Sequence, residues 1–398
     1  MLDNTAEEFD VVVIGAGPAG LTAAIRLAEL GKTVAVFEEH KEIGVPNHCT
    51  GLLSASGLKR IGIAPEKDFV QNEIRGARFH SPTQLTFTIE TQDVKAYVID
   101  RSAFDKMLGM RAIQAGVEIK LNTQVKKLKL SRREQTYFAE TNGENVHAKV
   151  IIDAEGYAAR LLRQVNLKPP NPKCMLPALQ FEISNLNVDS TMVELFFGRD
   201  IAPGFFAWIV PTSSDSVRVG LACRGRNLYQ RLKHFVDKTL GKVEVNQIRP
   251  GWVVLSGPIP RTFKDGFLVV GDAAGQVKPT TGGGVITSAI CAKVAGETAA
   301  KAIELNDTSE KTLKEYETGW RELLGKEFSA MSLVRKLANR LSDKTIDKIF
   351  QIIIKEELHQ TIAQKGDMDF QSAVIKAIIR HPKMLKTLTS VATDLLFG

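Results

Sequence analysis

A glycine-rich turn near the start of the sequence has the residue types and spacing that bind a dinucleotide phosphate. The segment reads Gly15-Ala16-Gly17-Pro18-Ala19-Gly20, a G-x-G-x-x-G pattern. Gly15 permits the tight turn, Gly17 lets the backbone approach a pyrophosphate, and Gly20 lets the following helix lie close to the strand. The N-terminus of that helix offers N–H groups to the phosphates. Glu38 stands where a carboxylate accepts hydrogen bonds from ribose hydroxyls, which favours FAD or NAD over NADP.

A second carboxylate with its own glycine-rich segment occurs late in the sequence. Gly271-Asp272 follows the apolar run 266–270, which places the carboxylate at the carboxyl end of a strand. The run Pro279-Thr280-Thr281-Gly282-Gly283-Gly284 then precedes a predicted helix over 285–305, whose first N–H groups can bind a second anionic centre. In a flavin enzyme this centre is the N1/O2 edge of the reduced ring.

These residues need a parallel sheet with helices to position them. The apolar runs 9–14 and 33–37 predict buried parallel strands, and the segment 21–30 between them has helical spacing. The segment 150–163 (VIIDAEGYAARLLR) predicts another strand that runs into a turn. The segments 76–97 and 173–258 instead alternate with period two, as in an antiparallel sheet with one covered face. The expected fold class is α/β, a Rossmann-like FAD-binding domain with an antiparallel-sheet substrate domain and a C-terminal helical region.

Composition excludes several other classes of protein. A length of 398 residues with 44% hydrophobic and 24% charged residues is typical of a globular chain of two or three domains. The four cysteines share no CxxC spacing, so we expect a reducing, cytoplasmic location, no structural zinc and no iron–sulfur cluster. No G-x-S-x-G, HExxH or histidine cluster supports a hydrolase or a metal site. A net charge of +7 is too small to indicate nucleic-acid binding.

The order of these motifs resembles the FAD-dependent family that is built like para-hydroxybenzoate hydroxylase, and within it the geranylgeranyl reductases. The resemblance covers nearly the whole chain. The family's Asp-Gly turn is here Glu155-Gly156, and its aromatic signature is Phe206-Ala207-Trp208-Ile209-Val210-Pro211. The other segments that carry the resemblance are Glu42-Ile43-Gly44, the region of Cys49, Asp100 to Asp105, Pro203 to Pro211, Gly271 to Ala274 and Pro279 to Gly284.

The resemblance implies FAD as the cofactor and a set of residues around it. Glu38 contacts the adenosine ribose, Arg101 lies near the pyrophosphate or the ring, and Asp272 contacts the ribitol–pyrophosphate region. Gly283 and Gly284 lie at the isoalloxazine edge. The pyrophosphate is approached by the first turn, that is by Gly15, Gly17, Ala19 and Gly20.

The implied reaction is saturation of C=C bonds in the geranylgeranyl chains of archaeal-type isoprenoid ether lipids. Phe205, Phe206 and Trp208 are apolar and suit an isoprenoid chain as the substrate. An isolated alkene has no carbonyl to take up charge, so hydride transfer needs a proton for the other carbon. His48 and Cys49, on the loop after the second strand, are the candidate proton donors, and Cys49 stands at the family's cysteine position.

The electron donor must come from outside, because the chain has a single G-x-G-x-x-G pattern and hence no nicotinamide domain of its own. Reduced ferredoxin and NAD(P)H are both candidates. A flavin-dependent monooxygenase or halogenase is the alternative function, since the halogenase signature Trp-x-Trp-x-Ile-Pro is close to the segment 206–211, although its first Trp is absent here. A third alternative is a non-catalytic flavoprotein that binds isoprenoid lipid.

The expected domains are discontinuous. Residues 1–75, 98–172 and 259–304 form the FAD-binding domain, residues 76–97 and 173–258 the antiparallel substrate domain, and residues 305–398 the C-terminal helical region. The C-terminal end carries Lys376, Arg380, Lys383 and Lys386 on amphipathic segments. Such an end packs on the protein as a helical cap or lies on the anionic inner face of the membrane as a peripheral contact.

Overall fold

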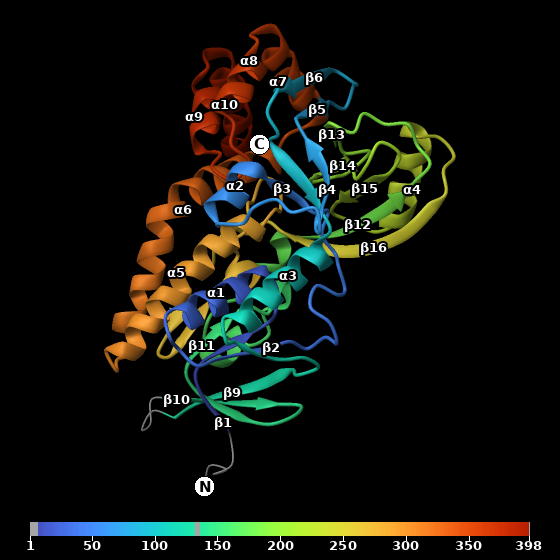
Figure 1. The fold of residues 1–398 in the computed structure, drawn as a ribbon. Coiled ribbons are helices and arrows are strands. Elements are labelled where there is room, and N and C mark those ends of the chain that lie inside the picture. The colour runs from blue at the N-terminus through green and yellow to red at the C-terminus, as the bar shows by residue number, and fades with distance from the viewer. Residues whose placement is uncertain (1–6, 132–135, 398) are drawn as a thin grey trace. The chain divides into compact units, whose positions relative to one another are not determined.

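The computed structural model describes residues 7–131 and 136–397, and side chains as far as Thr389. The chain divides into two compact units, each built from three stretches of sequence. The first unit contains residues 1–47, 101–174 and 254–328, and the second contains residues 48–100, 175–253 and 329–398. Each unit has its own sheet and its own helices (Figure 1). This mixed α/β architecture, with C-terminal helices, confirms the fold class expected from the sequence.

The first unit contains a sheet with a parallel centre. In the described residues its order is β17 (Phe263–Lys264), β18 (Phe267–Val269), β11 (Val146–Asp153), β1 (Glu7–Ile14), β2 (Val34–Phe37) and β8 (Glu118–Lys120), with β10 (Thr136–Thr141) and β9 (Val125–Ser131) added beside β11. Strand β1 pairs in parallel with β2 and β11. Residues 11–14 of β1 are all buried, as the apolar run predicted.

Helices cover the sheet of the first unit. These are α1 (Pro18–Glu29), α3 (Arg101–Gln114), α5 (Val285–Glu304) and the first part of α6 (Glu310–Ala338), with short turns η1 (Gly156–Ala158), η2 (Leu162–Val165), η3 (Pro172–Cys174) and η4 (Gly271–Ala274). Helix α1 packs against both α3 and α5. An apolar cluster that includes the buried Phe37, Ile151 and Phe267 forms a core on the sheet. The parallel strands therefore end together, beside the N-termini of the helices that follow them.

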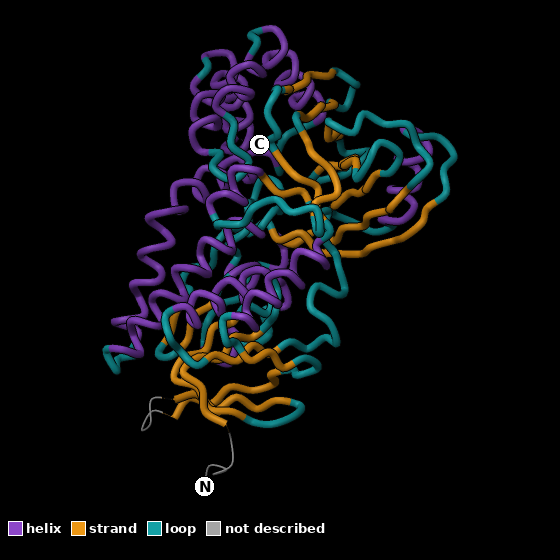
Figure 2. The backbone as a smooth tube through the Cα atoms, in the orientation of Figure 1, coloured by secondary structure: helices purple, strands orange, loops and turns teal. Residues whose placement is uncertain are grey.

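The second unit contains a seven-stranded sheet and a small three-stranded sheet (Figure 2). The larger sheet has the order β16 (Val245–Val254), β12 (Met175–Ile183), β15 (Val217–Ala222), β14 (Phe206–Pro211), β13 (Met192–Phe197), β5 (Gly76–His80) and β6 (Thr86–Glu90). The smaller one has the order β3 (Leu52–Ser54), β7 (Ala96–Ile99) and β4 (Val70–Ile74), and α2 (Ala55–Arg60) follows β3. The predicted antiparallel pattern holds for most of the larger sheet. One pair differs, because β13 lies parallel to β5, a strand far earlier in the chain.

One face of the larger sheet is covered by α4 (Leu228–Thr239). Its Leu232 and Phe235 pack with the buried Ile209 and Leu221 of the sheet. Because side chains alternate along a strand, the neighbours of these sheet residues, Trp208 among them, point to the opposite face.

The C-terminal helices form a cluster on the edge of the same sheet (Figure 2). They are α7 (Asp343–Lys355), α8 (Leu358–Lys365), α9 (Ser372–Arg380) and α10 (Pro382–Phe397). Phe350 of α7 and Met384 of α10 are buried in one cluster with Phe87 of β6. These contacts are those of a helical cap packed on the protein. None of the described helices is long and apolar enough to cross a lipid bilayer.

The two units group the chain differently from the three domains expected from the sequence. Residues 48–75 lie in the second unit, with the sheet that was assigned to the substrate domain. Residues 305–328 lie in the first unit, and residues 329–398 in the second. The functional division into an FAD-binding domain, a substrate domain and a C-terminal region stays a prediction.

Candidate active site

The turn between β1 and α1 places its three glycines in three different environments. Gly15 has φ +100°, and a Cβ there would lie 2.5 Å from the Ala154 backbone oxygen. At Gly20 a Cβ would lie 2.0 Å from the Gly15 oxygen, so this glycine lets α1 approach β1. At Gly17 no described atom lies within 4 Å of an added Cβ. The first and third glycines therefore serve the fold, and the second borders an open space.

The N-terminus of α1 faces that space. Gly17 is the N-cap residue, Pro18 follows it, and no described side chain caps the helix. The first N–H groups of a helix have no partner within the helix, and the helix dipole makes this end positive. A phosphate placed over Gly17 would satisfy those N–H groups. The open space and the missing cap therefore fit the pyrophosphate of a dinucleotide.

Glu38 lies directly after β2, where the sequence predicted a ribose contact. Its Oε2 accepts a hydrogen bond from the Ala16 N–H at 2.8 Å. Its Oε1 accepts one from the His40 N–H at 2.9 Å and lies 2.6 Å from His40 Nδ1. The carboxylate is thus held beside the glycine turn. The Oε2 atom has a further lone pair, so the side chain can also accept a hydrogen bond from a ribose hydroxyl.

A second polar turn follows β18. The Gly271 N–H donates to the buried Gln276 Oε1, and Gln276 Nε2 donates to the Tyr316 hydroxyl at 2.8 Å. This network holds the turn that carries Asp272. A Cβ built on Gly284, the N-cap of α5, would lie 3.1 Å from Asp272 Oδ1. The second carboxylate and the second glycine segment are therefore neighbours, as the sequence predicted, and Gly283 stands beside Lys278.

Arg101 begins α3 and forms a two-pronged ion pair with Asp105. Its Nε and Nη2 donate to Asp105 Oδ1 and Oδ2 at 3.0 and 2.9 Å. Burial raises the pKa of Asp272, and the Arg101 cation opposes that rise. Arg101 is therefore close enough to Asp272 to act on its charge. The pairing with Asp105 holds the guanidinium in place within the first unit.

A pair of carboxyl groups occupies the end of β11. Asp153 is fully buried, and its Oδ1 accepts from the Glu155 N–H at 3.0 Å. Burial and the nearby Glu155 charge raise the pKa of Asp153 well above its usual range. Burial also raises the pKa of Glu155 to about 7, although Arg160 opposes the rise. Glu155 begins the Glu155-Gly156 turn that the sequence analysis compared with an Asp-Gly motif. The pair also lies close to Gly15, because a Cβ added to Gly15 would clash with the backbone of Ala154, the residue between the two acids.

The loop that carries Cys49 belongs to the second unit. The Gly51 N–H donates to Cys49 Sγ at 3.3 Å. The buried Arg218 of β15 donates through Nη1 to the Thr50 oxygen at 2.7 Å and to the Ile99 oxygen at 3.0 Å. Its Nε binds Glu182 and its Nη2 binds Gln71. Arg218 therefore ties the cysteine loop to two sheets of this unit.

The same network reaches the aromatic residues. Gln180 Oε1 accepts from Thr50 Oγ1 at 2.8 Å and from Trp208 Nε1 at 3.3 Å. The Gln180 Nε2 is buried and has no hydrogen-bond partner among the described residues. Phe205 stacks on Phe206 with centroids 4.0 Å apart, and Phe206 packs edge-on against Trp208. The structure thus gathers these predicted substrate residues beside the Cys49 loop.

The predicted site residues fall into two groups, one in each unit. The cofactor residues lie in the first unit, at the ends of β1, β2 and β18 and at the starts of α1, α3 and α5. Cys49, Phe205, Phe206 and Trp208 lie together in the second. His48 is exposed and adjoins Gly251 rather than the network described above. No cluster of acidic, cysteine or histidine residues that could hold a metal ion is found in the part of the chain that the structure describes.

Sequence reasoning missed the roles of Arg218, Gln180 and Asp105, although Asp105 ends one of the segments that carry the resemblance. The first two share one signal, a polar residue within an apolar strand, since Arg218 interrupts VRVGLA and Gln180 interrupts MLPALQFEI. A buried polar side chain within a strand must find partners, so it indicates a network even where the partners are unknown.

The sequence matches the model of a protein family described as FAD binding domain over residues 8–322. A protein of Methanopyrus kandleri named digeranylgeranylglycerophospholipid reductase 2 is 34% identical over 95% of this chain and 98% of its own length. The digeranylgeranylglycerophospholipid reductase of Methanocaldococcus jannaschii is also 34% identical, over 95% of this chain and 97% of its own.

Among solved structures, a geranylgeranyl bacteriochlorophyll reductase-like protein from Thermoplasma acidophilum superposes with a TM-score of 0.87. It is 26% identical, and the match covers 97% of this chain and all of the other. A flavin-dependent brominase matches with a TM-score of 0.71 at 19% identity, over 94% of this chain and 98% of its own. This second likeness is one of fold.

Proposed function

The chain belongs to the FAD-binding domain family, in the group of the digeranylgeranylglycerophospholipid reductases, and on this basis we propose that it saturates the C=C bonds of geranylgeranyl chains in archaeal-type ether lipids. The protein is an FAD-dependent oxidoreductase, and FAD is its cofactor. The observation that carries the proposal is the similarity over nearly the full length to reductases of that name. The open, uncapped turn at Gly17 supports it from the structure.

The first unit supplies the groups that would hold FAD. The N–H groups at the start of α1 bind the pyrophosphate over Gly17, and Glu38 accepts from the adenosine ribose. Asp272 binds the ribitol–pyrophosphate region, and the N-terminus of α5 at Gly284 binds the anionic edge of the ring. When bound and reduced, FAD supplies a hydride from N5.

The second unit supplies the groups that would bind the lipid chain and move the proton. Phe205, Phe206 and Trp208 offer aromatic surface to an isoprenoid. Cys49 delivers the proton to the carbon of the double bond that does not receive the hydride, and His48 is the second candidate for this role. The hydrogen bond from the Gly51 N–H orients Cys49 Sγ. Arg218 acts as a positioning residue, because it holds the backbone of Thr50 next to that sulfur.

The two electrons must come from a separate donor, either reduced ferredoxin or NAD(P)H. The lipid substrate also requires access to a membrane surface. We propose a peripheral contact through the C-terminal helices, where Leu385 stays 47% exposed next to the exposed Lys383 and Lys386. A basic surface with an exposed apolar side chain suits an anionic bilayer.

Mass spectrometry of the reaction products tests the function directly. The FAD-loaded protein is reduced with dithionite and mixed with free, phosphorylated and glycerol-linked geranylgeranyl chains. We expect a gain of two hydrogens for each double bond reduced. No gain with any of the three substrates refutes the proposal. Oxygen consumption that depends on the substrate indicates a monooxygenase or halogenase instead.

A further inference from the structure

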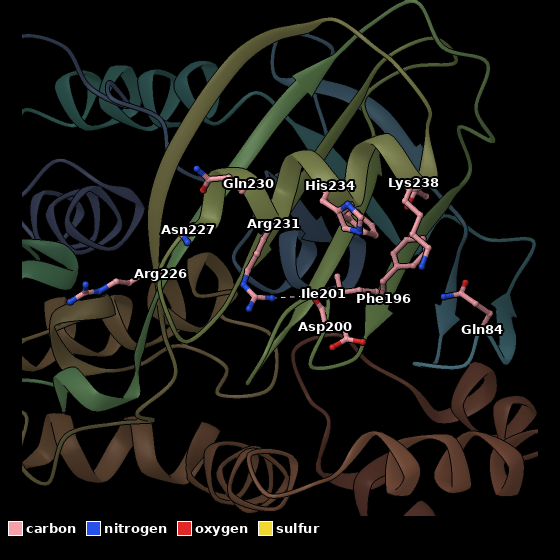
Figure 3. A pocket seen from close by; sticks show the side chains of 12 residues that line it. Gln84, Phe196, Asp200, Ile201, Arg226, Asn227, Gln230, Arg231, His234 and Lys238 are labelled. Atoms are coloured by element: carbon pink, nitrogen blue, oxygen red, sulfur yellow. Dashed lines mark hydrogen bonds between the residues drawn. The ribbon is translucent and has the colours of Figure 1, made fainter.

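A groove on the second unit combines basic side chains with an apolar floor (Figure 3). Its volume is about 510 Å³. It is bordered by α4, by the residues that follow β13 and by the turn between β5 and β6. The lining residues are Gln84, Phe196, Asp200, Ile201, Arg226, Asn227, Gln230, Arg231, His234, Phe235, Lys238 and Thr239.

The groove lies on the side of the sheet that α4 covers. Ile209 and Leu221, which pack with α4, have side chains on this face, whereas Trp208 points to the other. Within the second unit, the groove is therefore separated by the sheet from the aromatic residues assigned to the substrate. It is a different site from the one described above.

Cationic groups dominate the lining. Arg226, Arg231 and Lys238 carry permanent positive charge, and Asp200 is the one acidic residue among the lining residues. Arg231, His234 and Lys238 are spaced three and then four residues apart, so they share one face of α4 and project from the same side of it (Figure 3). Arg231 Nη1 donates to the Asp200 backbone oxygen at 3.0 Å. This bond orients the guanidinium, and among the described residues its other N–H groups are left to bind a ligand.

The start of α4 adds to this charge. The N-cap residue Asn227 has φ +67° and makes no side-chain cap, and the first turn contains no acidic residue. Within the described residues, the first N–H groups of this twelve-residue helix therefore lack the partner that a capping side chain normally provides. Both Asn227 and Arg226 line the groove. The positive helix end and Arg231, which lies one turn into the helix, therefore act on the same space, whereas Lys238 lies near the opposite end of α4.

The floor of the groove is apolar. Phe196 and Phe235 pack edge-on with centroids 4.9 Å apart, and Ile201 completes the floor. The concave shape and this floor suit a small anionic group with an apolar or glycerol part more than they suit the surface of another protein. An arginine binds a phosphate with two parallel N–H bonds, which gives it geometric as well as electrostatic selectivity.

We propose that this groove binds the phosphate ester head group of an anionic amphiphile, with Arg231 as the phosphate ligand. The phosphate lies between Arg231 and the start of α4, and the carbon part lies over Phe196 and Ile201. The site is independent of the flavin residues and of Cys49. Binding there neither requires nor consumes reducing equivalents.

Isothermal titration of the FAD-loaded full chain tests the site with two soluble probes, inorganic phosphate and sn-glycerol 1-phosphate. Sedimentation with vesicles of phosphatidylglycerol, and of phosphatidylcholine as the neutral comparison, tests the lipid source. The variants are Arg231→Gln and Arg231→Lys, of which the second keeps the positive charge but loses the two-pronged contact. Lys233→Gln is the matched control, because Lys233 lies on the same helix, pairs with Asp237 and does not line the groove.

We expect the wild type and Lys233→Gln to bind the phosphate probes equally. Arg231→Gln should bind them about five- to tenfold more weakly, the effect of removing one cation near an anion, and the affinity of Arg231→Lys should lie between the two. Cosedimentation with phosphatidylglycerol but not with phosphatidylcholine, reduced by the groove variants, identifies a lipid head group as the source. Binding of soluble probes without cosedimentation identifies a free phosphate ester.

The proposal is overturned if the wild type binds neither the soluble probes nor phosphatidylglycerol, or if the groove variants bind like the wild type. The flavin absorbance of each variant, with its thermal unfolding midpoint, reports whether it is folded and loaded. Because a lysine can still donate to the Asp200 oxygen, Arg231→Lys remains informative even if Arg231→Gln disturbs the fold.

Discussion

Substitution of Gly17 by alanine should separate flavin binding from folding. The backbone at Gly17 has φ −80° and ψ 177°, which alanine adopts without strain, and no described atom lies within 4 Å of the new Cβ. Alanine lowers the entropy of the unfolded chain, which stabilises the folded protein. It is also a poorer N-cap residue than glycine, which destabilises the folded protein by a similar amount. We therefore expect the free energy of unfolding of the apoprotein to change by less than about 1 kcal/mol.

The cost should appear in flavin binding instead. The added methyl group occupies the space through which a phosphate reaches the first N–H groups of α1. Loss of about one charge-assisted hydrogen bond is worth about 1.5–3 kcal/mol, or roughly 10- to 100-fold in the dissociation constant for FAD. Quenching of flavin fluorescence on titration of the apoprotein measures this constant, and urea unfolding of the same sample measures stability.

Gly20→Ala is the matched control, because its Cβ would lie 2.0 Å from the Gly15 oxygen. It should destabilise the apoprotein by about 1–3 kcal/mol or more through overpacking. The reasoning is wrong if Gly17→Ala binds FAD within about twofold of the wild type. It is also wrong if this variant loses as much stability as Gly20→Ala.

Three further predictions concern the acidic pair, the buried arginine and the cysteine loop. Because burial raises the pKa of Glu155 from 4.5 to about 7, the folded chain holds a proton that the unfolded chain releases, and stability should fall by about 3 kcal/mol as the pH rises from about 4.5 to 7. Glu155→Gln should reduce this slope in urea titrations at pH 5 and pH 8, with a part remaining because burial also raises the pKa of Asp153, and an unchanged slope contradicts the assignment. Arg218→Gln should lower the free energy of unfolding by about 1–3 kcal/mol, since the Thr50 and Ile99 oxygens lose their donor while Glu182 keeps Arg249, and an unchanged stability would speak against that role. Cys49→Ala should lower turnover by about 100-fold or more with FAD binding unchanged, because the proton donor is lost. The control is Cys223→Ala, in the buried core beneath α4, which should retain turnover if it folds. Equal turnover in the two variants excludes Cys49 as the proton donor.

The first βαβ unit could be predicted from the sequence because its signals are local. The runs 9–14 and 33–37 correspond to β1 (Glu7–Ile14) and β2 (Val34–Phe37), and the helix predicted over 285–305 is α5 (Val285–Glu304). Periodicity and glycine spacing report on neighbours along the chain, and the glycines of the turn do contact Ala154 and each other.

The network around Arg218 could not be predicted, because its partners come from distant parts of the sequence. Thr50, Gln71, Ile99 and Glu182 lie on four separate segments and meet only when the strands pair. The same holds for the parallel pairing of β13 with β5. Residue types show that a buried arginine needs partners, but the identity of those partners depends on strand order.

The polar residues of the predicted cofactor site were placed correctly at the ends of strands, but their own contacts were not foreseen. The Glu38 carboxylate accepts a hydrogen bond from the Ala16 N–H, and Arg101 forms an ion pair with Asp105. Spacing predicts where a side chain stands in a sheet. It does not show which nearby donor holds that side chain before a ligand arrives.

The interleaving of the two units has a consequence for the order of events during synthesis on the ribosome. By the time Gly284 emerges, the nascent chain has passed from one unit to the other four times, at residues 47, 100, 174 and 253. The glycine turn before α1 is synthesised early. The elements that surround this turn in the folded unit, β11, β18 and α5, are synthesised much later. We therefore predict that the nascent protein takes up its flavin only after most of the polypeptide has left the exit tunnel, and that a fragment truncated before α5 is made without the yellow colour of the cofactor.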